Sequence, residues 1–167
     1  DAQMNSVDAI NGAGLVTAST VDLNAATGIG NTTPLNLAAT TITADNSASG
    51  NVDLNNALGT AVSVTTLTTA GGGNIVFDQT GGGAVSFGTV STVADGTPAE
   101  GEADITLTSD SGNLTIATSV TAAGLGDIVY TTTTSGDIIL TGTTTASADD
   151  AQMNSVDAIN GAGLVTA

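Results

Sequence analysis

Apolar residues alternate with polar ones in short runs along this chain of 167 residues, and turn-forming residues separate the runs. This period of two predicts β-strands, whereas an apolar period of 3.6 residues never persists through two turns of a helix. Thr, Val and Ile are frequent in the runs, and their β-branched side chains fit a pleated surface. The pattern therefore predicts an all-β protein.

The apolar positions align into three columns when the chain is divided into coils of about 25 residues. The first column holds Val7, Ile29, Val52, Ile75, Ile105, Ile128 and Val156. The second holds Leu15, Leu35, Val62, Val85, Leu114, Ile138 and Leu164. The third holds Val21, Ile42, Leu67, Val90, Val120 and Thr144. Three columns predict three faces, each with an inward apolar row in every coil.

These columns predict a right-handed parallel β-solenoid (β-helix) of roughly triangular section, with about six coils per repeat unit. No coil can bury its apolar residues without a neighbour above and below it. Because coils stack at ~4.8 Å, six of them should advance roughly 29 Å along the axis. A competing register places Val21 and Leu23 in the first column, and gives five uneven coils and an advance of roughly 24 Å.

The first eighteen residues, DAQMNSVDAINGAGLVTA, return letter for letter at positions 150–167. Residues 1–149 are interpreted as one β-solenoid repeat unit, and residues 150–167 as the start of the next identical unit. A seam added at one end is the alternative interpretation, but the internal periods cross the seam without a break. The seam shows no capping sequence, so we expect units that stack end to end.

A triplet of Gly, then Asn or Asp, then an apolar residue marks the expected corners of the coils. It occurs at 50–52, 73–75, 112–114, 126–128 and 136–138. Gly and Asn tolerate the positive φ that a sharp corner needs. Asn side chains at stacked corners are expected to form ladders along the axis. Metal binding is the other interpretation of the Asp residues in these triplets.

The charge is entirely acidic: the chain has no Lys, Arg, His, Cys or Trp, and its 16 Asp and Glu residues give a net charge of −16. A chain without cations cannot neutralise phosphates, which excludes nucleic acid and anionic lipid surfaces as partners. No apolar run approaches the ~20 residues that cross a bilayer as a helix. No disulfide is possible, so stability must come from stacking. We expect an extracellular or cell-surface location.

Catalysis is not expected, because the chain lacks the side chains that usually serve as general base, activated nucleophile or cationic stabiliser. Carboxylate pairs remain, but most Asp residues fall at repeated corners rather than in one place. No cofactor is required by any motif.

One coil is longer than the others, and its extra residues, between Val93 and Ile105, form the most acidic segment of the chain. A polar insertion that leaves the flanking columns in register predicts a surface loop. Two interpretations are open: a solvated acidic loop, or a weak Ca²⁺ site, because Ca²⁺ takes carboxylate oxygens. The ligands of that site would be Asp95, Glu100, Glu102 and Asp104.

The third column is flanked by hydroxyl residues in a pattern close to Thr-x-Thr. The expected Thr-rich face consists of Thr41, Thr43, Thr66, Thr68, Thr89, Thr121, Thr143 and Thr145. It resembles the ice-binding face of solenoid antifreeze proteins, which implies an ice- or polysaccharide-binding module. The alternative is that these residues form the polar outer surface that any soluble solenoid needs.

Several strands with their corners, including Gly73-Asn74-Ile75-Val76-Phe77 and Gly112-Asn113-Leu114-Thr115-Ile116, resemble the β-strand repeats of giant bacterial exoproteins. Ala103-Asp104-Ile105-Thr106-Leu107 and Gly136-Asp137-Ile138-Ile139-Leu140 carry the same resemblance to filamentous-haemagglutinin-like adhesins. The resemblance implies a secreted or surface-attached fibre for adhesion, matrix or envelope building, and transfers no functional residues. The expected partners are identical neighbouring units, with lateral bundling of fibres through Ca²⁺.

Overall fold

A computed structural model of the chain describes residues 1–97 and 99–167 and leaves out Pro98, which belongs to the expected acidic loop. The described residues form fifteen strands and no helix. The first eight strands are β1 (Ala2–Asn5), β2 (Leu15–Ala25), β3 (Leu35–Asn46), β4 (Val52–Asn56), β5 (Val62–Thr69), β6 (Ile75–Gln79), β7 (Val85–Thr92) and β8 (Ile105–Ser109). The others are β9 (Leu114–Ala122), β10 (Ile128–Thr132), β11 (Ile138–Leu140), β12 (Thr143–Ala146), β13 (Ala151–Asn154), β14 (Ile159–Gly161) and β15 (Leu164–Thr166).

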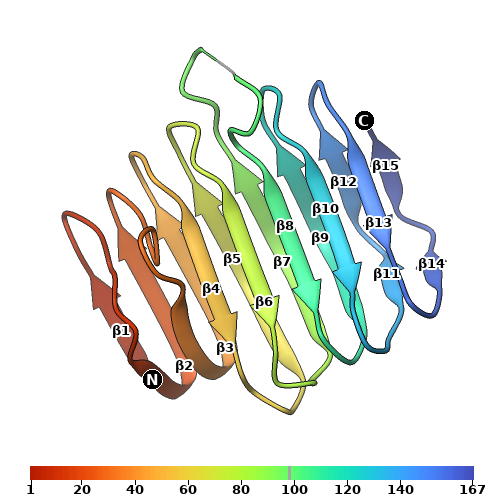
Figure 1. The fold of residues 1–167 in the computed structure, drawn as a ribbon, viewed down its shortest axis with the longest axis horizontal. Helices are drawn as coiled ribbons and strands as arrows, with labels where there is room; N and C mark the ends of the chain where they lie inside the picture. Colours follow the sequence, from red (N-terminus) through yellow and green to blue (C-terminus); the bar gives the residue numbers. More distant parts are fainter. Residues whose placement is uncertain (98) are drawn as a thin grey trace.

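All strand pairs are parallel, and the coils stack into a β-solenoid of about seven turns. Along one side, each residue pairs with its counterpart in the next coil. This row runs through Ile10, Ile29, Val52, Ile75, Ile105, Ile128 and Ala151. The two termini lie at opposite ends of the long axis (Figure 1). The expected parallel β-solenoid is therefore confirmed.

The core has three sides in its central coils. The first side consists of β4, β6, β8, β10 and β13. The second and third sides share the strands β5, β7 and β9, which bend where successive side chains point outward, as Thr65 and Thr66 do between buried Val64 and Leu67. In the last two coils these sides separate into β11 and β12, then β14 and β15. The corner between the second and third sides is therefore a bend within a strand.

Aromatic and aliphatic side chains from the three sides fill the core. Phe77 on the first side meets Phe87 on the second edge to face, with ring centroids 5.3 Å apart. The Tyr130 hydroxyl lies 3.0 Å from the Thr144 hydroxyl, so a first-side and a third-side residue are joined across the core. Edge-to-face aromatic pairs add about 0.5–1.5 kcal/mol to the stabilisation from burial alone.

Among the described residues, every buried polar side chain except Thr144 lies at the end of a strand, where the core reaches a corner. Asn56 and Gln79 are fully buried, and the Asn56 side-chain amide donates to the Gln79 side-chain oxygen at 2.9 Å. Asn56 also exchanges hydrogen bonds with the backbone of Ala39. Burial of a polar group without a hydrogen-bond partner destabilises the folded state. These hydrogen bonds supply the partners at the corner, where the chain turns after a strand.

The column pattern was correct in the central coils and wrong near the two ends. Val7 and Val156 were placed in the first column, but they lie in exposed turns, and Ile10 and Ala151 occupy their places. Leu35 pairs with Leu54 on the first side, because residues 30–34 loop out after Ile29. The remaining corrections are of register: Leu15 pairs with Asn36, Leu164 with Thr143, and Ile42 with Val64. The expected pairing of Val21 with Ile42 is confirmed.

The expected corner ladder is present. In five successive steps, the side-chain oxygen of an Asn or Asp accepts a hydrogen bond from the backbone N–H of the corner residue in the next coil, at 2.9–3.1 Å. The rungs are Asn31, Asn51, Asn74, Asp104, Asp127 and Asp150. Gly50 precedes one rung with a φ of 86°, and a Cβ there would lie 2.5 Å from the Thr27 carbonyl oxygen. The triplet is therefore a corner motif in which Gly permits the turn and Asx joins the coils.

Candidate stacking surfaces and side faces

The second copy of the eighteen-residue segment forms a coil on top of the preceding one. Ala151 to Asn154 pair with Ile128 to Thr131 on the first side, and Ile159 pairs with Ile138 on the second. The Asp150 backbone N–H donates to the Asp127 side-chain oxygen at 3.1 Å and so extends the corner ladder, and the Ser155 hydroxyl lies 3.2 Å from that of Thr132. The segment therefore continues the pairing, the ladder and the core of the coils before it.

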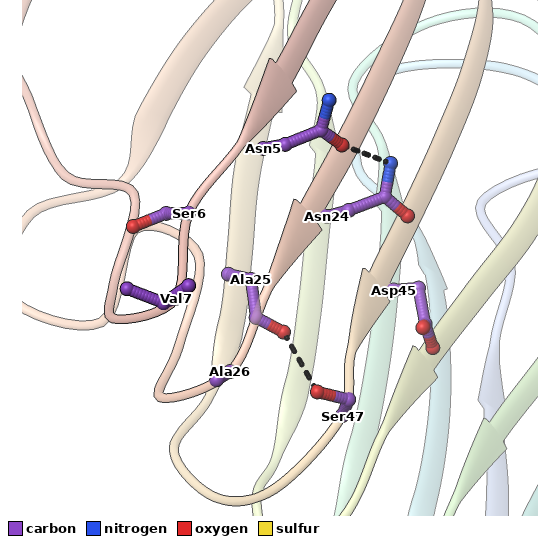
Figure 2. A pocket seen from close by; sticks show the side chains of 8 residues that line it. All are labelled: Asn5, Ser6, Val7, Asn24, Ala25, Ala26, Asp45 and Ser47. Atoms are coloured by element: carbon purple, nitrogen blue, oxygen red, sulfur yellow. Dashed lines mark hydrogen bonds between the residues drawn. The ribbon is translucent and has the colours of Figure 1, made fainter.

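The first copy forms the opposite edge of the solenoid. Ala2 to Asn5 pair with Val21 to Asn24, and the Asn24 side-chain amide donates to the Asn5 oxygen at 3.1 Å. Beside this strand the turn at Ser6 and Val7 stands out from the coils and borders a hollow of about 420 Å³ (Figure 2). A second hollow, of about 560 Å³, lies beside β10 and β13 at the other end. The first hollow extends along three stacked coils, because Asn5, Asn24 and Asp45 pair in register, and the second lies on the last two coils of the first side.

Apolar exposure is concentrated at these edges. Among the described residues, one exposed large hydrophobic side chain, Val93, belongs to the acidic loop. All the others belong to the two copies of the repeated segment: Val7, Leu15, Val156, Ile159, Leu164 and Val165. A soluble protein rarely leaves apolar residues clustered on a surface unless something covers them. The two ends are therefore the strongest candidates for contact surfaces.

The acidic loop leaves the corner between the third and first sides and projects beyond the neighbouring turns (Figure 1). The Asp95 carboxylate accepts hydrogen bonds from the backbone N–H and the hydroxyl of Thr97, at 2.8 and 3.0 Å. These bonds lower the pKa of Asp95. The Glu102 side chain instead lies over Gly72, with one buried carboxylate oxygen that has no hydrogen-bond partner.

The four predicted Ca²⁺ ligands are not brought together. Asp104 belongs to the corner ladder, where its side chain accepts the backbone N–H of Asp127. Within residues 1–97 and 99–167, no three acidic side chains lie close enough to one another to hold a metal ion.

Most of the predicted Thr-rich face lies on the third side. Thr43, Thr66, Thr89, Ser119 and Thr143 form one in-register row, and Asp45, Thr68, Ser91, Thr121 and Thr145 form the second. Thr41 is the exception, because it pairs with Ser63 on the second side. The row that was expected as Thr41-Ile42-Thr43 is therefore Thr43-Ala44-Asp45, and a hydrogen bond joins Thr68 to Asp45.

Unopposed negative charge shapes the outer surface of the first side. Partial burial raises the pKa of Asp53, and the neighbouring carboxylate of Asp78 raises it further. Three acidic rungs, Asp104, Asp127 and Asp150, also follow one another along the corner ladder. Because neighbouring coils are ~4.8 Å apart, these carboxylates repel one another, and dissolved salt screens this repulsion only in part.

Two features of the stacking surfaces were missed from the sequence. The strand-forming residues of the repeat are Ala-Gln-Met-Asn, whose two apolar residues face the core in both copies. Their period of two is visible in the sequence, but the run has only two apolar residues and neighbouring Val7 is the more strongly β-forming one. The pairing of Ile10 with Ile29 was hidden because it is a single bridge outside any strand.

The described part of the chain holds no helix long and apolar enough to cross a membrane. Comparison with protein-family models, with curated proteins and with solved structures found no match to this chain.

Proposed function

We propose that this protein is a structural repeat of a secreted or cell-surface fibre, in which units stack end to end as one continuous β-solenoid. One observation carries the proposal: residues 150–167, which have the sequence of the start of a unit, lie in register on the last coil of the unit before them. This arrangement supports a contact of the same kind between one unit and the next.

The exposed apolar residues support the same function. They gather at the two open edges, where a further coil would cover them, and the sides of the central coils are polar. Burial of apolar area contributes roughly 25 cal/mol per Å², so each added coil stabilises the edge beneath it. A matrix, envelope or adhesion scaffold needs such a rod, and the acidic surface keeps rods apart until salt or divalent cations reduce the repulsion.

Electron microscopy of chains with several tandem units tests the proposal. A continuous unbranched rod with a ~4.8 Å axial spacing and an advance of about 30 Å per unit is expected. Separate globules joined by linkers would contradict it, because the seam would then not be paired. Addition and chelation of Ca²⁺ during imaging tests bundling separately, since bundles that persist after chelation would not be held by cation bridges.

A second candidate, an ice- or polysaccharide-binding module, is favoured by the in-register double row of hydroxyls on the third side. Thermal hysteresis and retention on polysaccharide columns are its assays. Replacement of Thr66 and Thr68 by Tyr should abolish binding, whereas the same change at Thr106 and Thr108 on the first side is the matched control. Equal loss in both variants would contradict a specific third-side surface.

A further inference from the structure

The two copies of the repeated segment direct the same residues toward the core. Ala2 and Met4 in the first copy, and Ala151 and Met153 in the second, are partly buried and pack against the apolar core. The intervening Gln and Asn side chains are exposed in both copies. The alternation of inward and outward residues is therefore fixed by the segment itself.

The side of the solenoid that each copy occupies is different. Met4 pairs with Leu23, which continues through Ala44 and Leu67 along the third side. Met153 pairs with Tyr130, which continues through Leu107 along the first side. The same methionine of the repeat has thus moved from the third side to the next side in chain order.

The isoleucine of the segment moves in the same sense. Ile10 pairs with Ile29 on the first side, whereas Ile159 pairs with Ile138 on the second. The end of the segment moves further: Leu15 pairs with Asn36, which pairs with Asn55 on the first side, whereas Leu164 pairs with Thr143 on the third. Judged by the methionine and the isoleucine, the chain therefore completes six turns and one further side from one copy to the next.

We propose that successive units in the fibre are rotated by about one third of a turn around its axis, so that each unit continues on the next side of its neighbour. The partner at this interface is a second copy of the unit. The inference rests on the proposed end-to-end stacking and adds the rotation. The rotation follows because identical units should meet in the same way at every junction. At the junction seen here, the new unit begins with β13 on the first side.

The rotation determines what the outside of the fibre presents. The first side of one unit would be continued by the Thr-rich third side of the next, so no side would carry an unbroken row of hydroxyls. The acidic loop would leave a different corner in each of three successive units. The same view would return only after three units, which is roughly 19 coils or about 91 Å. Lateral contacts would then be available all around the rod.

Spin-label distances in a chain of two tandem units test the rotation, because the sequence contains no Cys of its own. Thr106 lies outward on the first side, and Thr121 lies outward on the third side of the same coil. One chain carries Thr106→Cys in both units. The other carries Thr106→Cys in the first unit and Thr121→Cys in the second, and with rotation its labels lie about seven coils apart on one side of the rod.

The mixed chain is expected to give the shorter distance, about 34 Å for seven coils, because rotation brings its two labels to one side of the rod. Without rotation the order reverses, and the chain with two Thr106→Cys labels gives the shorter distance. That reversal would overturn the inference and leave the continuous fibre intact. Broad, long distances in both chains would instead show an unpaired seam and overturn the proposed stacking itself.

Discussion

Tyr130 and Thr144 share a buried hydrogen bond of 3.0 Å between their hydroxyl oxygens, although one residue lies on the first side of the solenoid and the other on the third. Burial raises the pKa of the Tyr130 phenol well above its usual range, and the hydrogen bond to Thr144 opposes that shift. The pair is thus a polar link inside an apolar core.

Removal of either hydroxyl from this pair should destabilise the fold. Tyr130→Phe and Thr144→Val each leave one buried hydroxyl without a partner, and we expect each to cost about 1–3 kcal/mol in the free energy of unfolding. The double variant leaves neither hydroxyl, so it should cost less than the sum of the two. Denaturant unfolding of the four proteins gives the coupling energy, and strictly additive losses would show that the two hydroxyls act independently.

Removing one charge from the acidic rungs of the corner ladder should stabilise the protein. Asp127→Asn keeps the oxygen that accepts the Asp150 N–H and removes a carboxylate between Asp104 and Asp150. We expect a gain of up to about 1 kcal/mol at low ionic strength, which should vanish near 1 M salt. Asp127→Leu is the control, because it removes the accepting oxygen as well and should destabilise. No gain for Asp127→Asn at low salt would contradict the repulsion.

The Asp53 carboxyl should make the protein less stable as the pH rises. Its pKa is raised in the folded state by partial burial and by Asp78, so the folded protein holds this proton at pH values where the unfolded chain has lost it. Below the ordinary pKa of 3.8 the carboxyl is protonated in both the folded and the unfolded state, so it does not reduce stability. Above the raised pKa it is ionised in both states, and the full loss of folding stability is reached. Asp53→Asn should therefore raise the melting temperature at pH 7 and leave it nearly unchanged at pH 3. An equal shift at both pH values would assign the effect to packing instead.

Gly88 lies at the bend between the second and third sides, where the register between β7 and β9 shifts. A Cβ at this position would lie 2.5 Å from the Thr65 carbonyl oxygen in the neighbouring coil. We expect Gly88→Ala to destabilise by about 1–3 kcal/mol through forced backbone displacement. Gly14→Ala is the matched control, since nothing lies within 4 Å of its added Cβ. Equal melting temperatures for the two variants would show that the bend is not closely packed.

The register of the second copy can be tested by a disulfide across the seam. Ile139 and Asn160 are paired on the second side, and paired residues of neighbouring coils are ~4.8 Å apart, within the range that a disulfide spans. The variant Ile139→Cys with Asn160→Cys should therefore oxidise readily. Thr115→Cys with Asn160→Cys, two coils apart, should not. Peptide mapping by mass spectrometry after cleavage at acidic residues reads the result, and preferential cross-linking of the distant pair would contradict the register.

The central coils were predictable because their signals are local. Ile75 and Ile105 begin strands directly after an Asx corner, and strict alternation carries each strand to its next corner. The Thr rows of the third side followed from the same alternation, apart from Thr41. The acidic loop was located correctly; Asp104 takes part in the corner ladder, and the described residues contain no cluster of three acidic side chains that could hold a metal ion.

The sequence by itself determined the strands, the stacking of coils, the Asx corners and the identity of the repeated segment, since each depends on residues close together in the chain. Only the tertiary structure decided which side of the solenoid each end segment occupies, and that the second and third sides share bent strands. The physical reason is that a short alternating strand satisfies any side equally well, so its place depends on the coil beneath it. Met4 and Met153 demonstrate this, because one sequence lies on two different sides.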